Sequence, residues 1–102
     1  MKHFPDLISR LPAYAGRFEA VQLDAEGCKV LFASYPAGTE IESHTHDTEN
    51  VGVITQGELI LTTSAGEERY GPGDWYHVAA NQPHAARFEQ TTSEVEFWFC
   101  CD

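Results

Sequence analysis

The sequence is poor in basic residues and has none of the long apolar runs that mark a membrane segment. Six Lys and Arg stand against sixteen Asp and Glu, which gives a formal net charge of −10. Because such a surface repels nucleic acid and anionic membranes, we expect neither as a partner. No apolar run approaches the roughly 18 residues of a membrane span, and the N-terminus has no apolar core of a secretion signal.

Cysteine is also scarce, and its placement excludes a disulfide framework or a zinc-binding pattern. The three cysteines are Cys28, Cys100 and Cys101, an odd number. Cys100 and Cys101 are adjacent, so in a strand they face opposite sides. We interpret all three as reduced thiols of a cytoplasmic protein, and expect Cys28 to be a small buried apolar residue.

The length and the overall composition are those of one small globular domain, residues 1–102. Hydrophobic residues make up 42% and charged residues 22% of the chain. Because a chain this short buries only a modest part of its surface, further burial in a homodimer is expected. We expect a small-molecule ligand; if it is anionic, it needs a local positive centre in this acidic protein, which a divalent metal could supply.

Short segments of β-branched and aromatic residues, separated by turn residues, fill most of the chain. Residues 4–11 could form one helical turn closed by Pro12. From Arg17 onward the pattern predicts strands. They are expected at 17–24, 28–35, 40–46, 50–56, 58–63, 67–71, 75–78, 84–90 and 94–101. Nine short strands without a long helix predict an all-β protein, either a closed barrel or a sandwich, with a core at about 17–101.

Two histidines in the stretch from Gly38 to Gly57 suggest a metal site. His44 and His46 are two residues apart in a predicted strand, so their side chains share a face about 7 Å apart, and a metal could lie between them. His84 could join them only if strand pairing brings it there. His77 is the competing candidate, which we interpret instead as a surface or dimer-contact histidine.

Alternation along the strands extends this metal face. It predicts that Glu40 and Glu42 face the same way as His44. Further inward positions are expected at Asn50, Gly52, Ile54, Gln56, Ala86, Phe88 and Gln90, with Arg87 facing outward. On the last strand, one face carries Val95, Phe97, Phe99 and Cys101, and the other carries Glu94, Glu96, Trp98 and Cys100. The pattern leaves open which of these two faces lines the interior.

The spacing of these residues resembles the two sequence motifs of the cupin family. The first family motif is G-x5-H-x-H-x3/4-E-x6-G, and Gly38, His44, His46 and Gly57 stand in register with it, with Asn50 at the carboxylate position. Glu49 is one place too early and should face away. The second motif, G-x5-P-x-G-x2-H-x3-N, is matched at Gly73 and His84, while Ala79, Asn81 and Phe88 occupy its other places.

The resemblance implies a double-stranded β-helix, the cupin jelly-roll barrel, with a short N-terminal helical turn. It further implies that His44, His46 and His84 converge on one divalent transition metal, with Asn50 as a fourth, neutral ligand. Zn, Fe, Ni, Mn or Cu could occupy such a site, since imidazole suits several of these metals. Neutral ligands leave the ion its full positive charge, which favours Lewis-acid polarisation of a carbonyl or carboxylate.

Within the cupins, the segment H-T-H-D-T-E-N is similar to that of the small pectin-degradation cupins, which linearise unsaturated uronates. This resemblance implies sugar-acid isomerisation or uronate linearisation, and it places an acidic catalytic residue near Glu96; Tyr35 is the other candidate base. The arginine that follows the last strand in that group has no counterpart here. Two alternatives stay open: a three-histidine Fe(II) dioxygenase, and a non-catalytic ligand-binding or sensor cupin.

Overall fold

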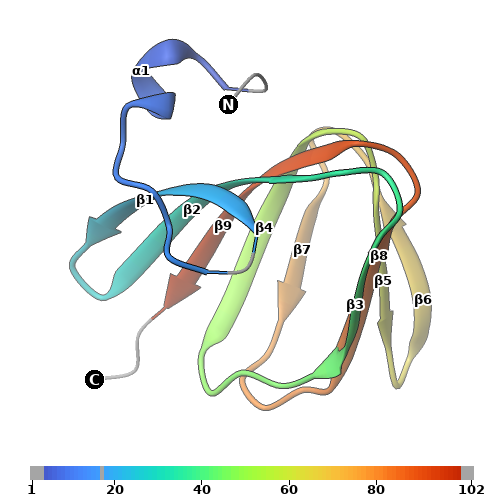
Figure 1. Ribbon diagram of the computed structural model, residues 1–102. Helices are drawn as coiled ribbons and strands as arrows, with labels where there is room; N and C mark the ends of the chain where they lie inside the picture. Colours follow the sequence, from blue (N-terminus) through green and yellow to red (C-terminus); the bar gives the residue numbers. More distant parts are fainter. Residues whose placement is uncertain (1–3, 17, 100–102) are drawn as a thin grey trace.

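The computed structural model describes residues 4–16 and 18–99. Within them the chain forms one short helix and nine strands (Figure 1). The elements are α1 (Asp6–Ser9), β1 (Glu19–Ala25), β2 (Cys28–Tyr35), β3 (Thr39–His44), β4 (Glu49–Gln56), β5 (Leu59–Thr63), β6 (Gly66–Tyr70), β7 (Trp75–Val78), β8 (His84–Phe88) and β9 (Thr92–Phe99). The described part contains no helix that is long and apolar enough to cross a membrane.

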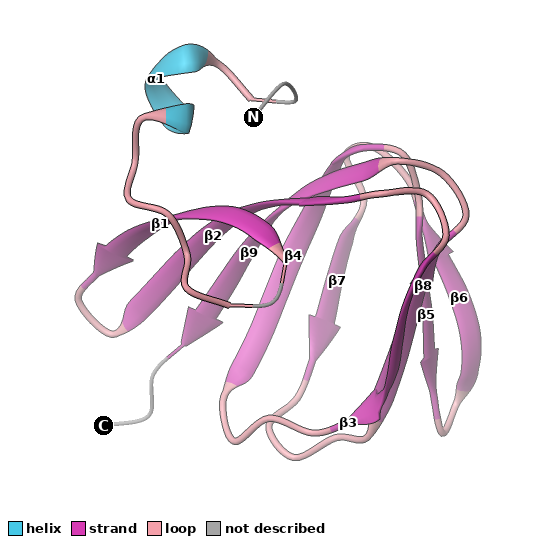
Figure 2. Cartoon of the chain, in the orientation of Figure 1, coloured by secondary structure: helices cyan, strands magenta, loops and turns pink. Residues whose placement is uncertain are grey.

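The strands form two antiparallel sheets that face each other (Figure 2). The five-stranded sheet has the order β1-β2-β9-β4-β7, and the four-stranded sheet has the order β3-β8-β5-β6. Successive strands repeatedly cross between the sheets, for example from β4 to β5 and from β7 to β8. The predicted all-β fold with one short helical turn is therefore confirmed.

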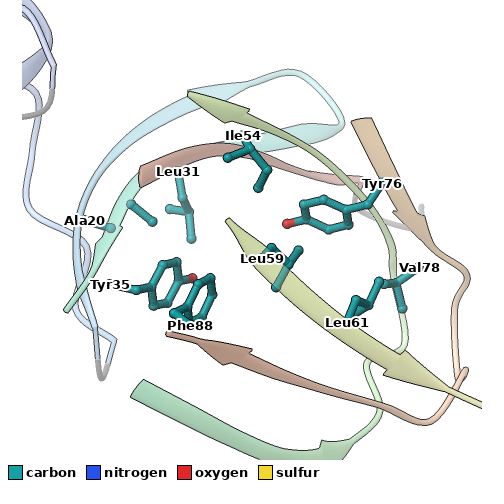
Figure 3. Close-up of a cluster of buried hydrophobic side chains, with 10 residues drawn as sticks. Ala20, Leu31, Tyr35, Ile54, Leu59, Leu61, Tyr76, Val78 and Phe88 are labelled. Atoms are coloured by element: carbon teal, nitrogen blue, oxygen red, sulfur yellow. The ribbon is translucent and has the colours of Figure 1, made fainter. Parts of the chain in front are cut away.

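The apolar core lies between the sheets and is built from the alternating inward residues of both (Figure 3). Its centre includes a stack of Tyr35 on Phe88, with ring centroids 4.3 Å apart. Gly52 on β4 leaves room for the ring of Tyr76, because a Cβ there would lie 2.4 Å from the ring. The buried cluster consists of Ala20, Leu31, Ala33, Tyr35, Ile54, Leu59, Leu61, Tyr76, Val78 and Phe88.

One turn depends on glycine for two separate reasons. Gly57 connects β4 to β5 with a φ of +84°, a region that side chains other than glycine rarely adopt. A Cβ at this position would also lie 2.4 Å from the carbonyl oxygen of Thr91. The glycine therefore allows the chain to leave one sheet while pressed against the segment that enters β9.

The structure corrects several sequence expectations about strand faces. Glu40 and Glu42 are exposed, and Ile41 faces the pocket instead. The cause is a register shift between Ile41 and His44, which interrupts the strict alternation on which the prediction depended. Gln56 and Gln90, expected to face inward, are exposed because they lie at or beyond strand ends.

Strand boundaries and cysteine positions also differ in detail from the expectations. The third strand ends at His44 rather than 46, β8 ends at Phe88 rather than 90, and the last strand begins at Thr92 rather than 94. Cys28 is a free thiol and only half-buried. Cys100 and Cys101 lie outside the described residues.

Candidate metal centre

Three histidines from separate segments converge at one end of the space between the sheets. β3 and β8 are paired so that His44 lies opposite His84, and His46 follows in the loop after β3. Potential ligand atoms of the three side chains all lie within 4.8 Å of one another. Strand pairing thus brings the distant His84 to the His-x-His pair.

Backbone carbonyls fix the orientation of two of these rings. The Nδ1 of His44 lies 2.8 Å from the carbonyl oxygen of Glu42, and the Nδ1 of His84 lies 2.9 Å from that of Gln82. Because a carbonyl only accepts, both Nδ1 atoms carry the proton, and each Nε2 presents a lone pair. The Nε2 atoms of His44 and His46 are 3.1 Å apart. This orientation by outer partners is typical of metal-binding histidines.

The local environment favours the neutral form of His46 and His84, which is the form that metal ligation requires. Burial, followed by the neighbouring His44 and His84, lowers the pKa of His46 to about 4. Burial also lowers the pKa of His84, which is 6% exposed. Three imidazole nitrogens within 4.8 Å of one another fit a divalent transition metal, so the cluster could hold such an ion.

Asn50 lies beside this cluster, on the inner face of β4. It is 4% exposed and lines the same pocket as the histidines. Its Nδ2 donates a hydrogen bond of 3.3 Å to the carbonyl oxygen of Phe97. Since the amide nitrogen is used there, Oδ1 is the atom through which Asn50 would ligate a metal. Its role as fourth ligand stays a prediction.

The histidines open into a small pocket between the two sheets. Its cavity volume is about 70 Å³, well below the roughly 300–1,000 Å³ of pockets for drug-sized ligands. Apolar side chains form most of the wall. The lining residues are Phe18, Tyr35, Ile41, His44, His46, Asn50, Leu59, Leu61, Tyr76, Val78, His84, Ala86, Phe88, Glu94, Glu96 and Trp98.

Glu96 is a buried carboxyl group in the wall of this pocket. It is 2% exposed and accepts hydrogen bonds from the Tyr35 hydroxyl at 2.5 Å and from Trp98 Nε1 at 3.0 Å. Burial raises the pKa of Glu96, and the two hydrogen bonds oppose that rise. The Trp98 ring in turn lies edge-on to the His46 ring, with centroids 4.6 Å apart. The acidic face of β9 is therefore the inner one.

Glu94 is a second buried carboxyl group, for which sequence reasoning offered no role. It is 2% exposed and accepts a hydrogen bond from the hydroxyl of Tyr76. Burial, and then the charge of Glu96, raise the pKa of Glu94 well above its ordinary value. Burial likewise raises the pKa values of Tyr35 and Tyr76, so both hydroxyls remain protonated donors. The only sequence signal was that Glu94 and Glu96 share one strand face.

Two other residues considered from the sequence lie outside the pocket. His77 is exposed and pairs with Glu49, with 2.6 Å between its Nε2 and Glu49 Oε1. It therefore takes no part in the histidine cluster. Arg87 faces outward as expected and pairs with Glu67 at 2.7 Å.

Comparisons with known proteins agree with this fold. The family model of the cupin domain matches residues 31–100. A cupin superfamily protein from Desulfitobacterium hafniense is similar in structure, with a TM-score of 0.77, 17% identity, and coverage of 99% of this chain and 94% of that chain. No curated protein matches the sequence.

Two named enzymes share the fold over part of their own length. The DMSP lyase from Ruegeria pomeroyi has a TM-score of 0.73 and 22% identity, over 87% of this chain and 52% of that chain. The salicylate 1,2-dioxygenase from Pseudoaminobacter salicylatoxidans has a TM-score of 0.73 and 16% identity, over 86% of this chain and 27% of that chain. At these identities the likeness concerns the fold alone. The family model that matches residues 31–100 establishes that the chain belongs to the cupin superfamily, and the shared fold agrees with this assignment.

Proposed function

We propose that this cupin is a metal-dependent enzyme that moves a proton on a small carbonyl or carboxylate compound. Sugar-acid isomerisation and the linearisation of an unsaturated uronate are reactions of this kind. The observation that carries the proposal is the presence of a buried carboxyl group, Glu96, in the same small pocket as three converging imidazoles. Buried acids with shifted pKa values in a cleft are typical of catalytic sites.

His44, His46 and His84 would hold the metal, with Asn50 as a neutral fourth ligand. A divalent metal bound there supplies a Lewis acid for a carbonyl or carboxylate oxygen. Since none of the four ligands carries a negative charge, this end of the pocket can attract an anion despite the net charge of −10.

Glu96 is the group that we assign to proton transfer. Burial raises its pKa, which brings it closer to neutral pH, where a carboxyl can both accept and return a proton. Tyr35 and Trp98 each donate a hydrogen bond to the carboxyl group and so fix its orientation. Because the pKa of Tyr35 is also raised, we assign this hydroxyl the role of a donor rather than a base.

The size of the pocket restricts the substrate. A cavity of about 70 Å³ admits a molecule of only a few heavy atoms, or the reacting end of a larger one. A uronate would therefore enter by its reacting end. A neighbour of the same fold, the DMSP lyase from Ruegeria pomeroyi, supports an enzymatic role for this scaffold.

The activity is tested by following the loss of the ultraviolet absorbance of an unsaturated uronate. Wild-type protein should consume the substrate, His44→Ala should not, and the control Thr62→Ala, at an exposed site outside the cluster, should behave like wild type. Equal rates for wild type and His44→Ala would exclude this reaction. Elemental analysis of protein purified without an affinity tag should find about one transition metal per chain.

An Fe(II) dioxygenase is the second candidate, favoured by the same neutral three-histidine set and by the shared fold with a salicylate 1,2-dioxygenase. Anaerobic loading with Fe(II) followed by substrate-dependent oxygen uptake would distinguish it. A non-catalytic ligand-binding or sensor role would instead show as ligands that raise the melting temperature without being turned over.

A further inference from the structure

The outer face of the five-stranded sheet carries apolar side chains where a water-facing sheet usually carries polar ones. Because Asn50, Glu94 and Glu96 face the pocket, the alternate residues of their strands face outward. Trp75 is 58% and Phe99 43% exposed, and the ring of Trp75 stacks on Phe97 with centroids 6.0 Å apart. We call this surface the apolar face; it consists of Val51, Val53, Trp75, Val95, Phe97 and Phe99.

We propose that a second copy of this chain covers the apolar face. Two copies with a net charge of −10 each repel one another wherever acidic side chains meet. None of the six residues of the apolar face is charged, so like copies can approach there with the least repulsion. Two identical sheet faces can also pack directly on each other about 10 Å apart, in a two-fold symmetric interface.

The available area sets the expected strength of this dimer. The apolar face lies on β4, β7 and β9, and three strands about 4.8 Å apart and about seven residues long cover roughly 330 Å². Phe4 packs on Phe32 of β2, with ring centroids 5.6 Å apart, so the outer side at β2 is already in contact with the N-terminal segment and does not add to this area. Two such faces would bury about 660 Å², well below the roughly 1,200 Å² at which stable interfaces begin. We therefore expect reversible dimerisation.

Sedimentation velocity from low micromolar to millimolar concentration tests the interface. The wild-type mass should rise from that of the monomer toward twice that value, and Trp75→Lys or Phe99→Lys should remain monomeric. Each lysine reduces the net negative charge, so a loss of dimer could not come from a larger overall repulsion between the copies. The matched control is Thr62→Lys, at an exposed site on the other sheet. A concentration-independent monomer, or a dimer insensitive to Trp75→Lys, would overturn the proposal.

A different set of contacts links the histidine cluster to a surface carboxylate. The loop between β7 and β8 touches two of the three histidines. The backbone N–H of Asn81 donates to the carbonyl oxygen of His46 at 2.6 Å, and the carbonyl oxygen of Gln82 accepts from His84 Nδ1 at 2.9 Å. The position of this loop therefore determines where two of the imidazoles lie.

Glu49 fastens this loop to the end of β4. One carboxylate oxygen accepts a hydrogen bond of 2.8 Å from the backbone N–H of Ala80, and the other lies 2.6 Å from Nε2 of His77 on β7. Glu49 is exposed and directly precedes Asn50. It faces away from the pocket and yet bridges β4, β7 and the loop.

We infer that Glu49 is a positioning residue for the metal centre, acting through the loop that orients His84 and His46. The inference rests on the proposed metal-dependent function. Loss of a partner that orients a ligating histidine typically costs about 10–100-fold in metal affinity. Because Glu49 acts one contact further out, we expect a loss near the lower end, about tenfold.

Competition with a chromophoric chelator measures this effect as a Zn(II) dissociation constant. Glu49→Ala should weaken binding about tenfold, Glu49→Gln should weaken it less because its side-chain oxygen can still accept from Ala80, and the control Glu67→Ala should match wild type. The absorption spectrum of the Co(II) form should also shift in Glu49→Ala. Equal affinity and spectrum in wild type and Glu49→Ala would overturn the inference alone. A wild-type protein that binds no metal would overturn the metal centre as well.

Discussion

The two sheets are built on opposite principles, although they enclose the same pocket. The four-stranded sheet is charged outside, where Arg69 and Arg87 form ion pairs with Glu58, Glu67 and Glu89. The five-stranded sheet has the apolar face outside and the carboxyl groups of Glu94 and Glu96 inside. The first arrangement is what stability and solubility favour.

The second arrangement costs stability, and this difference indicates where function lies. A buried carboxyl is stable only when it is hydrogen-bonded, and here each is bonded to a tyrosine from another strand. An apolar surface facing water gains nothing until something covers it. The inner and outer features of the five-stranded sheet are thus the basis of the proposed reaction and of the proposed dimer, respectively.

The largest effect is expected where the four-stranded sheet supplies metal ligands. His84→Ala removes one of three converging nitrogens and should weaken Zn(II) binding by more than about a hundredfold, beyond what the loss of an outer partner costs. Isothermal titration calorimetry measures the change, with Thr62→Ala, at an exposed site on the same sheet, as the control. Undiminished affinity in His84→Ala would contradict the assignment of the site.

The inner acids of the five-stranded sheet should make stability depend on pH in an unusual direction. The folded-state pKa of Glu94 is raised by burial and by Glu96, so between the ordinary pKa of glutamate and this higher value the folded protein binds more protons than the unfolded chain. The contribution of Glu94 to stability is therefore largest at low pH and is lost as pH rises through that window.

Glu94→Gln removes this contribution while its side-chain oxygen can still accept from Tyr76. The variant should be more stable than wild type at pH 8, and the difference should shrink toward pH 4, as measured by urea unfolding at both values. A variant that is less stable at pH 8 would show that the carboxylate itself is needed there. Glu89→Gln, on the exposed surface, is the matched control.

The smallest effect is expected from the outer ion pairs of the four-stranded sheet. Arg69 and Glu58 are 2.9 Å apart, with side chains 49% and 29% exposed. A double-mutant cycle of Arg69→Ala and Glu58→Ala should give a coupling of about 0.2–1 kcal/mol, because water and salt screen such pairs. A coupling of several kcal/mol would show that the outer ion pairs of the four-stranded sheet stabilise the fold strongly, and the contrast between the two sheets would then not hold.

The strand pattern and the histidine spacing carried most of what could be predicted from the sequence. The segments around His44, Asn50 and His84 were expected as strands because alternation and turn residues are local properties of the chain. The meeting of His84 with His44 needed the family resemblance, since strand pairing over that separation is not encoded locally. The pairing itself was then found as expected.

The remaining features depend on information that alternation does not contain. A period of two says which residues share a face, and it leaves open which face is inside, so Glu94 could not be recognised as buried. One irregular register in β3 was enough to turn Glu40 and Glu42 outward. The hydrogen bond from the backbone N–H of Ala80 to Glu49 joins residues far apart in sequence, so no local sequence pattern predicts it.

The placement of the two tryptophans gives the protein two intrinsic fluorescent probes in different environments. The Trp98 ring contacts the imidazole of His46 and donates a hydrogen bond to the carboxyl group of Glu96. Trp75 lies on the opposite side of the same sheet and is exposed to solvent. The sequence has no third indole. The fluorescence of Trp98 therefore reports on binding in the pocket, and the fluorescence of Trp75 reports on binding at the apolar face. Two single variants, Trp75→Phe and Trp98→Phe, would separate the two signals without any added label.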